Sequence, residues 1–321
     1  MTQGQFISHC TADALNSAAA HLQAGRLVAI PTETVYGLGA DATNADAVAR
    51  IYKVKGRPAD HPLIVHLADA QDIAEWAQEI PDYAIDLARS FWPGPMTLVL
   101  KRSPLAQDFI TGGQETVGLR VPDHTLALAF LAAFKKLGGK GVAAPSANRF
   151  GHVSPTTAIA VHEELGAYLD GEDLILDGGP SAVGVESTIV DCTAAAPRIL
   201  RPGAITIEMI EAVTGVKVVN RDDIIRVSGA LEHHYAPAAQ VVLDGHPRPG
   251  DGLIALSSFP TPEGVIRLAS PLNNEDFARQ LYGALREADA QGIDQVIVFQ
   301  PEGEDIAIAI RDRLKRAATR G

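Results

Sequence analysis

Residues 30–58 of the chain, IPTETVYGLGADATNADAVARIYKVKGRP, carry most of what the sequence predicts about the fold. The segment is typical of a buried strand, a polar turn containing glycine, and a helix that Thr43 or Asn44 can cap. The end of this helix carries four cations in eight residues with no acid among them: Arg50, Lys53, Lys55 and Arg57. Like charges repel, so a packed protein usually keeps such a cluster to receive an anion. Because the whole chain has a formal net charge of −12, the cluster stands out and indicates a phosphate-bearing ligand.

Length and composition limit the class of protein. A chain of 321 residues with 46% hydrophobic content can bury a large core, and its length suggests two domains. A charged fraction of 21% is ordinary for a globular protein and argues against disorder. The acidic balance argues against a general nucleic-acid-binding surface. The two cysteines, Cys10 and Cys192, lack CxxC spacing, which argues against a disulfide framework or a cysteine zinc site and fits a reducing compartment.

The sequence also indicates where the protein works. The N-terminal residues MTQGQFISHC lack the basic start and apolar run of a signal peptide. The longest apolar run, residues 126–134, is too short to cross a bilayer. We therefore expect a soluble, cytoplasmic protein without membrane contact.

Apolar periodicity predicts two α/β regions joined by an irregular segment. In the first region several strands follow one another without an intervening helix, which predicts a mixed sheet with antiparallel members. The residues after about 218 mix charges, glycine, histidine and proline without periodicity and are typical of a linker. Predicted strands are 27–31, 63–67, 97–101, 116–121, 141–144, 174–176, 188–191, 198–200, 241–243, 253–256, 265–268 and 295–299. Predicted helices are 12–23, 44–54, one within 69–79, 82–90, 125–137, 156–165, 206–212, 274–290 and 305–318.

The commonest nucleotide-binding loops are missing from the sequence. It contains no GxxxxGK[ST] loop, no GxGxxG between a strand and a helix, no GxSxG and no HExxH. Other segments could bind a ligand instead. Residues 55–58 could bind phosphate through Lys55 and Arg57, or form a solvated helix end where the helix dipole favours cations. Ser146 and Asn148 follow a buried strand and could present a hydroxyl and an amide to one ligand, or form an ordinary turn.

Three further residues are candidates on local grounds. Arg201 follows a strand and could close on a phosphate or cap a turn. His66 lies in an apolar strand, where a satisfied core histidine is the commoner case. Arg120 is flanked by apolar strand residues, and a guanidinium in such a place needs a carboxylate or phosphate partner.

Taken together, seven segments closely resemble the YrdC-like domain of threonylcarbamoyl-AMP synthases, in order from about residue 15 to 215. They are PTETVYGLG, IYKVKGRP, FWPGPMTLVL, TVGLRVP, APSANRFGHVSPT, VESTIVD and ILRPGAI. The linker ending in HYAP at residues 234–237 and the tail segments FARQLYGALREAD and IRDRLKRAA resemble the long, two-domain form. The resemblance implies an α/β fold: a twisted mixed-sheet YrdC-like catalytic domain with a concave cationic cleft over residues 1–216. It further implies a linker or lid over 217–238 and a small Rossmann-like α/β domain over 239–321.

The resemblance also implies an activity. Members make L-threonylcarbamoyl-adenylate and pyrophosphate from L-threonine, bicarbonate or CO2, and ATP, with Mg²⁺ on the phosphates and no tightly bound organic cofactor. Downstream transfer proteins, which we expect to be transient partners, move the threonylcarbamoyl group to the adenosine 3′ of the anticodon in tRNAs that read ANN codons. Direct stable tRNA binding is not expected.

The family's functional positions map onto this sequence residue by residue. The signature pairs, and so the expected catalytic residues, are Lys55, Arg57, Ser146 and Asn148. The implied ATP-binding residues are Arg57, His61, Thr116, Ser146, Ser154, Arg201 and Tyr235. The implied L-threonine-binding residues are Thr34, His66, Arg120, Ala144 through its backbone, and Ser187. No metal ligand from the protein is implied.

Two departures and two rival functions accompany this hypothesis. Many members have asparagine at the position of His61, and the linker VSGALEHHYAP has Leu231 and His233 where many carry cations. The alternative function is an RNA-binding module using the cationic cleft, but the net charge of −12 and the aromatic content of 5% argue against it. The carbamoyl-transfer domains of hydrogenase-maturation enzymes are a closer rival. They belong to much longer chains with zinc-finger and acylphosphatase-like parts, which this sequence does not show.

Overall fold

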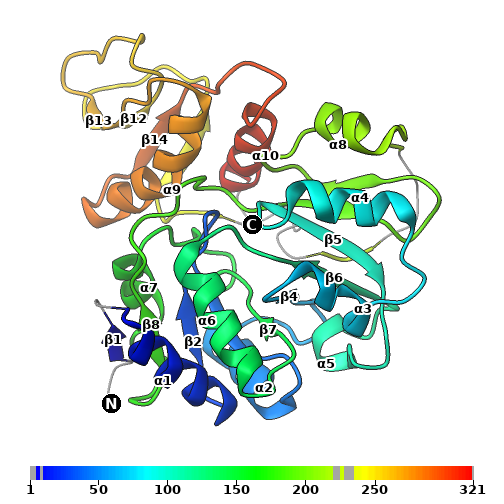
Figure 1. Ribbon diagram of the computed structural model, residues 1–321. Helices are drawn as coiled ribbons and strands as arrows, with labels where there is room; N and C mark the ends of the chain where they lie inside the picture. Colours follow the sequence, from blue (N-terminus) through cyan, green and yellow to red (C-terminus); the bar gives the residue numbers. More distant parts are fainter. Residues whose placement is uncertain (1–4, 8–9, 220–224, 228–234, 320–321) are drawn as a thin grey trace.

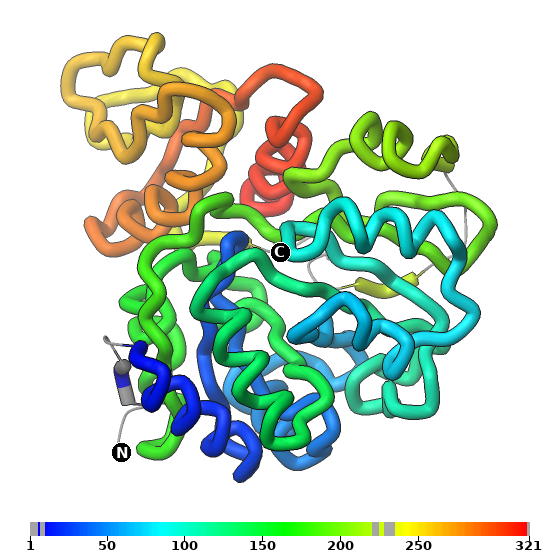
Figure 2. Tube along the Cα trace, in the orientation of Figure 1, coloured from blue at the N-terminus to red at the C-terminus, as the bar shows by residue number. Residues whose placement is uncertain are grey.

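The computed structural model describes residues 5–7, 10–219, 225–227 and 235–319. These residues form a larger α/β unit and a smaller one packed against it, and Figure 1 shows the smaller unit in the yellow-to-red part of the chain. Figure 2 shows the same two units as a tube along the Cα trace. Every helix in the described ranges falls short of the length and apolar character needed to span a membrane.

The larger unit is built on a ten-stranded sheet in the order β1-β8-β2-β3-β7-β4-β6-β5-β9-β10. Four neighbouring pairs are parallel, namely β1 with β8, β2 with β8, β4 with β6, and β5 with β9, and the other neighbours are antiparallel. The mixed sheet predicted from the sequence is therefore confirmed. The strands are β1 (Gln5–Ile7), β2 (Val28–Ile30), β3 (Gly37–Asp41), β4 (Ile64–His66), β5 (Met96–Lys101), β6 (Thr116–Arg120), β7 (Val142–Ala143), β8 (Leu174–Leu176), β9 (Thr188–Asp191) and β10 (Arg198–Arg201).

Helices cover the sheet and begin and end where capping residues allow. In α2 (Ala45–Lys55) the Asn44 side chain accepts hydrogen bonds from two backbone N–H groups of the first turn, as the sequence predicts. Gly56, in the left-handed conformation with φ 64°, ends this helix. Figure 1 shows α1 and α6 side by side. The remaining helices are α1 (Ala12–Gln23), η1 (Ala70–Asp72), α3 (Ile73–Trp76), α4 (Asp82–Phe91), α5 (Asp108–Thr111), α6 (Thr125–Lys136), α7 (Ala158–Leu165) and α8 (Ile207–Thr214).

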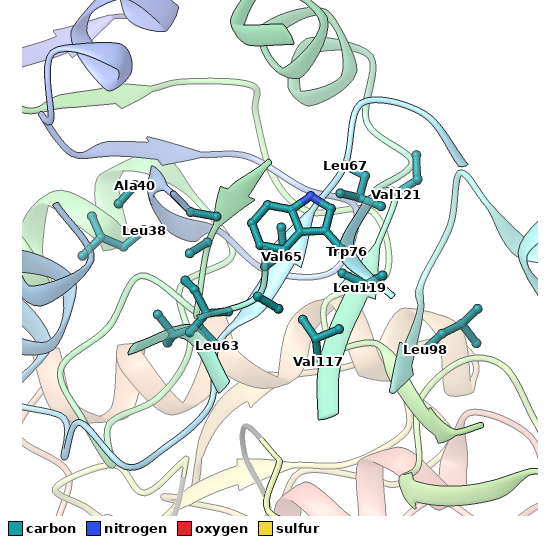
Figure 3. Packing of buried hydrophobic residues seen from close by; sticks show 14 of the residues in the cluster. Leu38, Ala40, Leu63, Val65, Leu67, Trp76, Leu98, Val117, Leu119 and Val121 are labelled. Atoms are coloured by element: carbon teal, nitrogen blue, oxygen red, sulfur yellow. The ribbon is translucent and has the colours of Figure 1, made fainter. Parts of the chain in front are cut away.

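The main core lies against the central strands of this sheet. Figure 3 shows the Trp76 indole among Val65, Leu67 and Leu119, which come from β4, the residue after it, and β6. Trp76 is fully buried, and its Nε1 donates to the Lys140 carbonyl at 3.1 Å. A side chain of this size buries on the order of 200 Å², which is worth about 5 kcal/mol of burial free energy.

The smaller unit contains a four-stranded sheet in the order β11-β14-β12-β13, and every strand pair in it is parallel. Its central strands are buried along their length, which is typical of a parallel sheet covered by helices. This confirms the predicted second, smaller α/β unit. Its elements are β11 (Gln240–Leu243), β12 (Gly252–Ile254), β13 (Ile266–Ala269), α9 (Asn274–Ala290), β14 (Gln295–Val298) and α10 (Ala307–Ala318).

The structure corrects the secondary structure predicted for part of residues 30–58. Residues 37–41, expected to belong to a polar turn, form strand β3 between β2 and β7. A Cβ on Gly39 would lie 2.8 Å from the Val28 carbonyl oxygen and 2.9 Å from Val142 Cγ1, so close strand approach requires glycine there. Strand β1 and helix α5 are also absent from the sequence prediction. Of the predicted linker, the described residues 217–219, 225–227 and 235–238 contain no helix or strand, and Leu231 and His233 lie outside the described residues.

Candidate active site

A polar pocket opens at one edge of the large sheet, where segments far apart in the sequence meet. The loop between β2 and β3 forms one wall, and the ends of β4 and β6 and the residues after β7 form the floor. The residues before β9, the end of β10 and the described end of the linker form the opposite wall. The lining residues are Thr32, Thr34, Val35, Tyr36, Gly37, Ile64, His66, Arg120, Ala144, Pro145, Ser146, Glu186, Ser187, Arg201 and Tyr235.

Arg120 and His66 are brought together by strand register. Strands β4 and β6 are parallel, and His66 pairs with Arg120 at the carboxyl ends of both. Arg120 is buried, and its Nη1 donates to Thr34 Oγ1 at 2.9 Å. Its Nη2 lies 2.7 Å from Glu33 Oε1 in a buried ion pair. The carboxylate partner that the sequence requires for Arg120 is therefore present within the protein itself.

His66 is held in its neutral form. It is 3% exposed. Burial, and after it the charge of Arg120, lowers the pKa of His66 to about 3. At neutral pH the imidazole can therefore donate one hydrogen bond and accept another without adding charge to the pocket.

The opposite wall is organised around Ser187. Its hydroxyl lies 2.8 Å from Thr97 Oγ1, and Arg201 Nη2 donates to it at 3.1 Å. Arg201 Nε and Nη2 both donate to the Ser187 carbonyl, at 3.1 and 3.0 Å. Arg201 is 3% exposed, so its guanidinium is fixed in direction before any ligand arrives.

Lys55 and Asn148 lie under the pocket floor and do not line it. Lys55 Nζ donates to the carbonyls of Ser146 and Asn148, at 2.6 and 2.5 Å. Burial, helped by the neighbouring Arg57, lowers the pKa of Lys55 well below its usual range. Asn148 Nδ2 donates to the carbonyls of Arg149 and His152, at 2.7 and 2.8 Å. The two predicted signature pairs are thus physically joined, and Ser146 is the member that reaches the pocket.

Arg57 and His61 lie beyond the end of α2. Arg57 is 7% exposed and its Nη2 donates to the Pro62 carbonyl at 3.0 Å. Burial lowers the pKa of Arg57 to about 10, and the positive charge of Arg201 acts in the same direction. Arg57 is not among the residues that line the pocket, whereas Arg201 is. His61 packs edge-on against Phe150, with ring centroids 5.4 Å apart, and its pKa is lowered by burial and then by Arg57.

Thr116 and Ser154 both lie outside the main pocket, at different places around it. Thr116 lines a second hollow that shares Ile64 with the main pocket and is bordered by Arg226 from the described part of the linker. Ser154 is buried behind the wall, and its Oγ donates to Glu186 Oε1 at 2.6 Å.

The fold separates the four cations at residues 50–57, which corrects the expectation that they act together as one anion site. Arg50 turns to Asp170 and Asp173, with Nη2 at 2.6 and 2.7 Å from their carboxylates, and Lys53 is exposed. Lys55 is buried against the loop at residues 146–148, and Arg57 is buried after the helix end. Lys55 is five residues from Arg50 and two from Lys53, so it projects from a different face of α2, and Arg57 lies beyond the end of the helix.

Seven of the fifteen lining residues, among them Thr32 and Glu186, were not among the predicted site residues. The sequence signal for both was position: Thr32 stands two residues before Thr34, and Glu186 directly before Ser187. Within the described ranges, no group of three or more His, Cys, Asp or Glu side chains is arranged to hold a metal ion. Arg120 lies against Glu33, and Arg201 close to Glu186, so the concave cationic cleft stays a prediction.

Fold and pocket together define a two-unit α/β protein with one buried polar site at the edge of its larger, mixed sheet. A family model described as "Telomere recombination" matches residues 20–203, and one described as "Threonylcarbamoyl-AMP synthase, C-terminal domain" matches residues 205–319. The chain belongs to the threonylcarbamoyl-AMP synthase family, in its two-domain form.

Individual relatives agree over nearly the full length. The chain is 39% identical to the threonylcarbamoyl-AMP synthase of Pyrococcus abyssi, over 94% of this chain and 93% of that protein. It is also 39% identical to that of Bacillus subtilis, over 94% and 92%. The crystal structure of Pyrococcus abyssi Sua5 complexed with L-threonine matches with a TM-score of 0.86 at 36% identity, covering 99% of this chain and 97% of that one.

Proposed function

We propose that this protein synthesises L-threonylcarbamoyl-adenylate and pyrophosphate from L-threonine, bicarbonate or CO2, and ATP. The product serves the threonylcarbamoylation of the adenosine 3′ of the anticodon in tRNAs that read ANN codons. The observation that carries the proposal is the pocket itself, in which two buried arginines, Arg120 and Arg201, face a neutral histidine and several hydroxyls. It lies in a chain that resembles a threonine-bound relative over its whole length.

The threonine end of the pocket is proposed to be Thr34, His66, Arg120, Ser187 and the backbone at Ala144. A guanidinium fork suits the amino acid's carboxylate, which would share Arg120 with Glu33. Neutral His66 and the Ser187 hydroxyl suit the substrate hydroxyl and amine, because each can donate and accept a hydrogen bond.

The ATP end is proposed to lie toward Arg201 and the end of α2. Arg57, which follows α2, and Arg201, which lines the pocket, are buried cations that suit the phosphates of MgATP, which we treat as a single substrate. Ser146 and Tyr235 also line the pocket, and Ser154 is buried behind it. Thr116 lines the neighbouring hollow, and His61 directly precedes Pro62 of its lining, so both are assigned to the remaining part of the nucleotide.

The reaction is largely a problem of charge. The threonine amine loses a proton and adds to CO2, giving an N-carboxylate. An oxygen of this carboxylate then attacks the α-phosphorus of ATP, and the bond from that phosphorus to the bridging oxygen breaks to release pyrophosphate. Nucleophile and target are both anionic, so the arginines act by neutralising charge and fixing geometry. The pocket offers no obvious general base, and none is needed for the second step.

Lys55 and Asn148 are assigned a supporting role in this scheme. Their hydrogen bonds hold the loop at residues 144–148 in one shape, which fixes Ser146 and the backbone at Ala144. A rigid loop matters because small misplacement of reacting groups lowers the rate strongly.

The parts of the chain are proposed to divide the work as follows. Residues 1–216 form the catalytic domain, 217–238 a linker that covers the ATP side, and 239–321 a small domain that supports it. The lid role rests on Tyr235, which lines the pocket although it comes from the linker. Carbamates lose CO2 readily, so a cover that excludes water has a clear purpose. We place the enzyme in the cytoplasm, with transient downstream transfer proteins as its partners.

An isotope experiment tests the proposal. The protein is incubated with MgATP, L-threonine and ¹³C-bicarbonate, and the products are separated and weighed by mass spectrometry. The account predicts threonylcarbamoyl-adenylate carrying one ¹³C. Threonyl-adenylate without the label would show ordinary amino-acid activation, and binding of single-stranded RNA with no adenylate of any kind would favour the RNA-binding alternative.

A further inference from the structure

One buried carboxylate in the pocket wall is held by the smaller unit. Glu186 lines the pocket, and its Oε1 accepts from Ser154. Its Oε2 accepts from the Tyr282 hydroxyl and from Arg313 Nε, each at 2.9 Å. Tyr282 belongs to α9 and Arg313 to α10, and both are fully buried. Side chains of the C-terminal unit therefore hold a lining residue of the pocket in place without lining the pocket themselves.

Arg313 contacts both flanks of the Ser187–Arg201 pair. Besides the Glu186 carboxylate, its Nη2 donates to the Pro202 carbonyl at 3.0 Å. Glu186 directly precedes Ser187, and Pro202 directly follows Arg201. A single guanidinium thus ties together the two chain segments that present the serine hydroxyl and the arginine of the ATP side.

Tyr282 and Arg313 also pack against the Tyr235 ring. The Tyr235 ring stacks on the Tyr282 ring, with centroids 5.8 Å apart and planes 21° apart. The Arg313 guanidinium lies 5.4 Å from the Tyr235 ring centroid, within range of a cation–π interaction. Tyr235 is 1% exposed, and its contacts with Tyr282 and Arg313 help to fix the position of its ring in the pocket.

Apolar packing shows that the contact is continuous. Val35, which lines the pocket, and Val185, which directly precedes Glu186, belong to the same buried cluster as Phe277 and Leu281 of α9. Gly184 has φ 84°, and a Cβ there would lie 2.4 Å from the Ala278 carbonyl oxygen. The loop that carries Glu186 therefore lies directly on the α9 backbone, with no room for a side chain.

We propose that Tyr282 and Arg313 are positioning residues of the active site, acting through Glu186, Tyr235 and the Ser187–Arg201 segments to shape the ATP side. The C-terminal unit then shapes the catalytic pocket and is more than an attached docking domain. This inference rests on the proposed function for its assignment of the ATP side. A buried carboxylate needs such partners, since an unpaired charge in this place is strongly unfavourable.

The test first compares four single variants with the wild-type enzyme, and a double-mutant cycle with Glu186→Gln follows. Tyr282→Phe removes only the hydroxyl, and Arg313→Met removes the charge while keeping a long apolar side chain. Arg311→Met is the control on the same helix, because Arg311 donates to the Pro301 and Gly303 carbonyls inside the smaller unit. Tyr83→Phe is the control for loss of a buried tyrosine hydroxyl, which in this case donates to the Ala194 carbonyl at 2.7 Å.

Binding of ATP and of L-threonine is measured by calorimetry, which does not require turnover, and pyrophosphate release gives kcat and both KM values. We expect Tyr282→Phe and Arg313→Met to weaken ATP binding by about tenfold, roughly the loss of one hydrogen bond to a charged group. Threonine binding should change by less than about threefold, and the two controls should match the wild type within about twofold. Adding Glu186→Gln to Arg313→Met should cost less than the sum of the two single changes, because both act through one contact.

The inference is overturned if Tyr282→Phe and Arg313→Met bind ATP like the controls. It is also overturned if both substrates lose affinity equally, since that indicates general loss of structure. If Arg313→Met does not fold, Tyr282→Phe decides alone by the same criteria. A wild-type protein that binds ATP and releases no pyrophosphate refutes the proposed function, whereas the ATP affinities of the variants still test the positioning role.

Discussion

Replacing His66 by glutamine removes an imidazole that the fold holds buried and neutral beside Arg120. His66 is 3% exposed at the end of β4, and burial together with the Arg120 charge lowers its pKa to about 3. Because the pKa in the folded state lies below that in the unfolded chain, the unfolded chain takes up a proton first as the pH falls. The stability that His66 contributes is therefore complete above its ordinary pKa and is lost as the pH falls toward its folded value.

The size of the effect follows from the two pKa values. The interval from the ordinary 6.5 to about 3 is roughly 3.5 units, or about 5 kcal/mol in total at about 1.36 kcal/mol per unit. Between pH 7.0 and pH 4.5 the unfolded histidine becomes charged while the folded one stays mostly neutral. The expected loss over this range is about 2.5 kcal/mol from His66 alone.

The assay is urea unfolding of the wild type and of His66→Gln at pH 7.0 and pH 4.5. Carboxylates that titrate in this range affect both proteins alike, so the difference of the two pH differences isolates His66. The wild type should lose about 2.5 kcal/mol more than the variant over this pH range. Equal losses, within about 0.5 kcal/mol, would refute the claim that His66 is held neutral.

Three other changes give separate tests. Lys55→Met should lower the unfolding free energy by about 1–3 kcal/mol for each of the two loop carbonyls left without a donor, and should lower kcat. An unchanged urea midpoint would contradict the bracing role. Arg120→Lys keeps the charge beside the buried carboxylate of Glu33 and loses the fork, so KM for threonine should rise about tenfold and that for ATP far less. The opposite ranking would mean that the two ends of the pocket are reversed. Arg57→Met should raise KM for ATP by about tenfold, whereas Arg50→Met should leave it unchanged, because Arg50 is occupied by two aspartates. Equal effects of these two changes in a steady-state assay would remove Arg57 from the ATP side.

Much of the fold was predictable because local signals and packing agree. The Asn44 cap of α2 was predicted from the sequence, and the structure has it. Strand β3 was not predictable on the same basis, since GLGAD has two glycines and no β-branched residue. Its strand form comes from pairing with β2 on one side and β7 on the other.

Eight of the predicted site residues line one pocket, but the sequence did not predict the contacts among them. Arg120 in an apolar strand correctly indicated a need for a partner, but nothing local showed that Glu33 is that partner. Lys55 looks like a phosphate ligand in sequence, and only the fold shows its ammonium under the floor of the pocket. The contact between Glu186 and Arg313 spans 127 residues of sequence and two domains, so no local pattern reports it.

The central claim is tested most directly by pyrophosphate release from ATP, with L-threonine and bicarbonate omitted in turn. The account predicts release only when both are present. Release with threonine alone, after rigorous removal of CO2, would contradict it by showing that the amino acid itself is adenylated. If no pyrophosphate is released under any condition, the proposed synthase activity is contradicted as a whole.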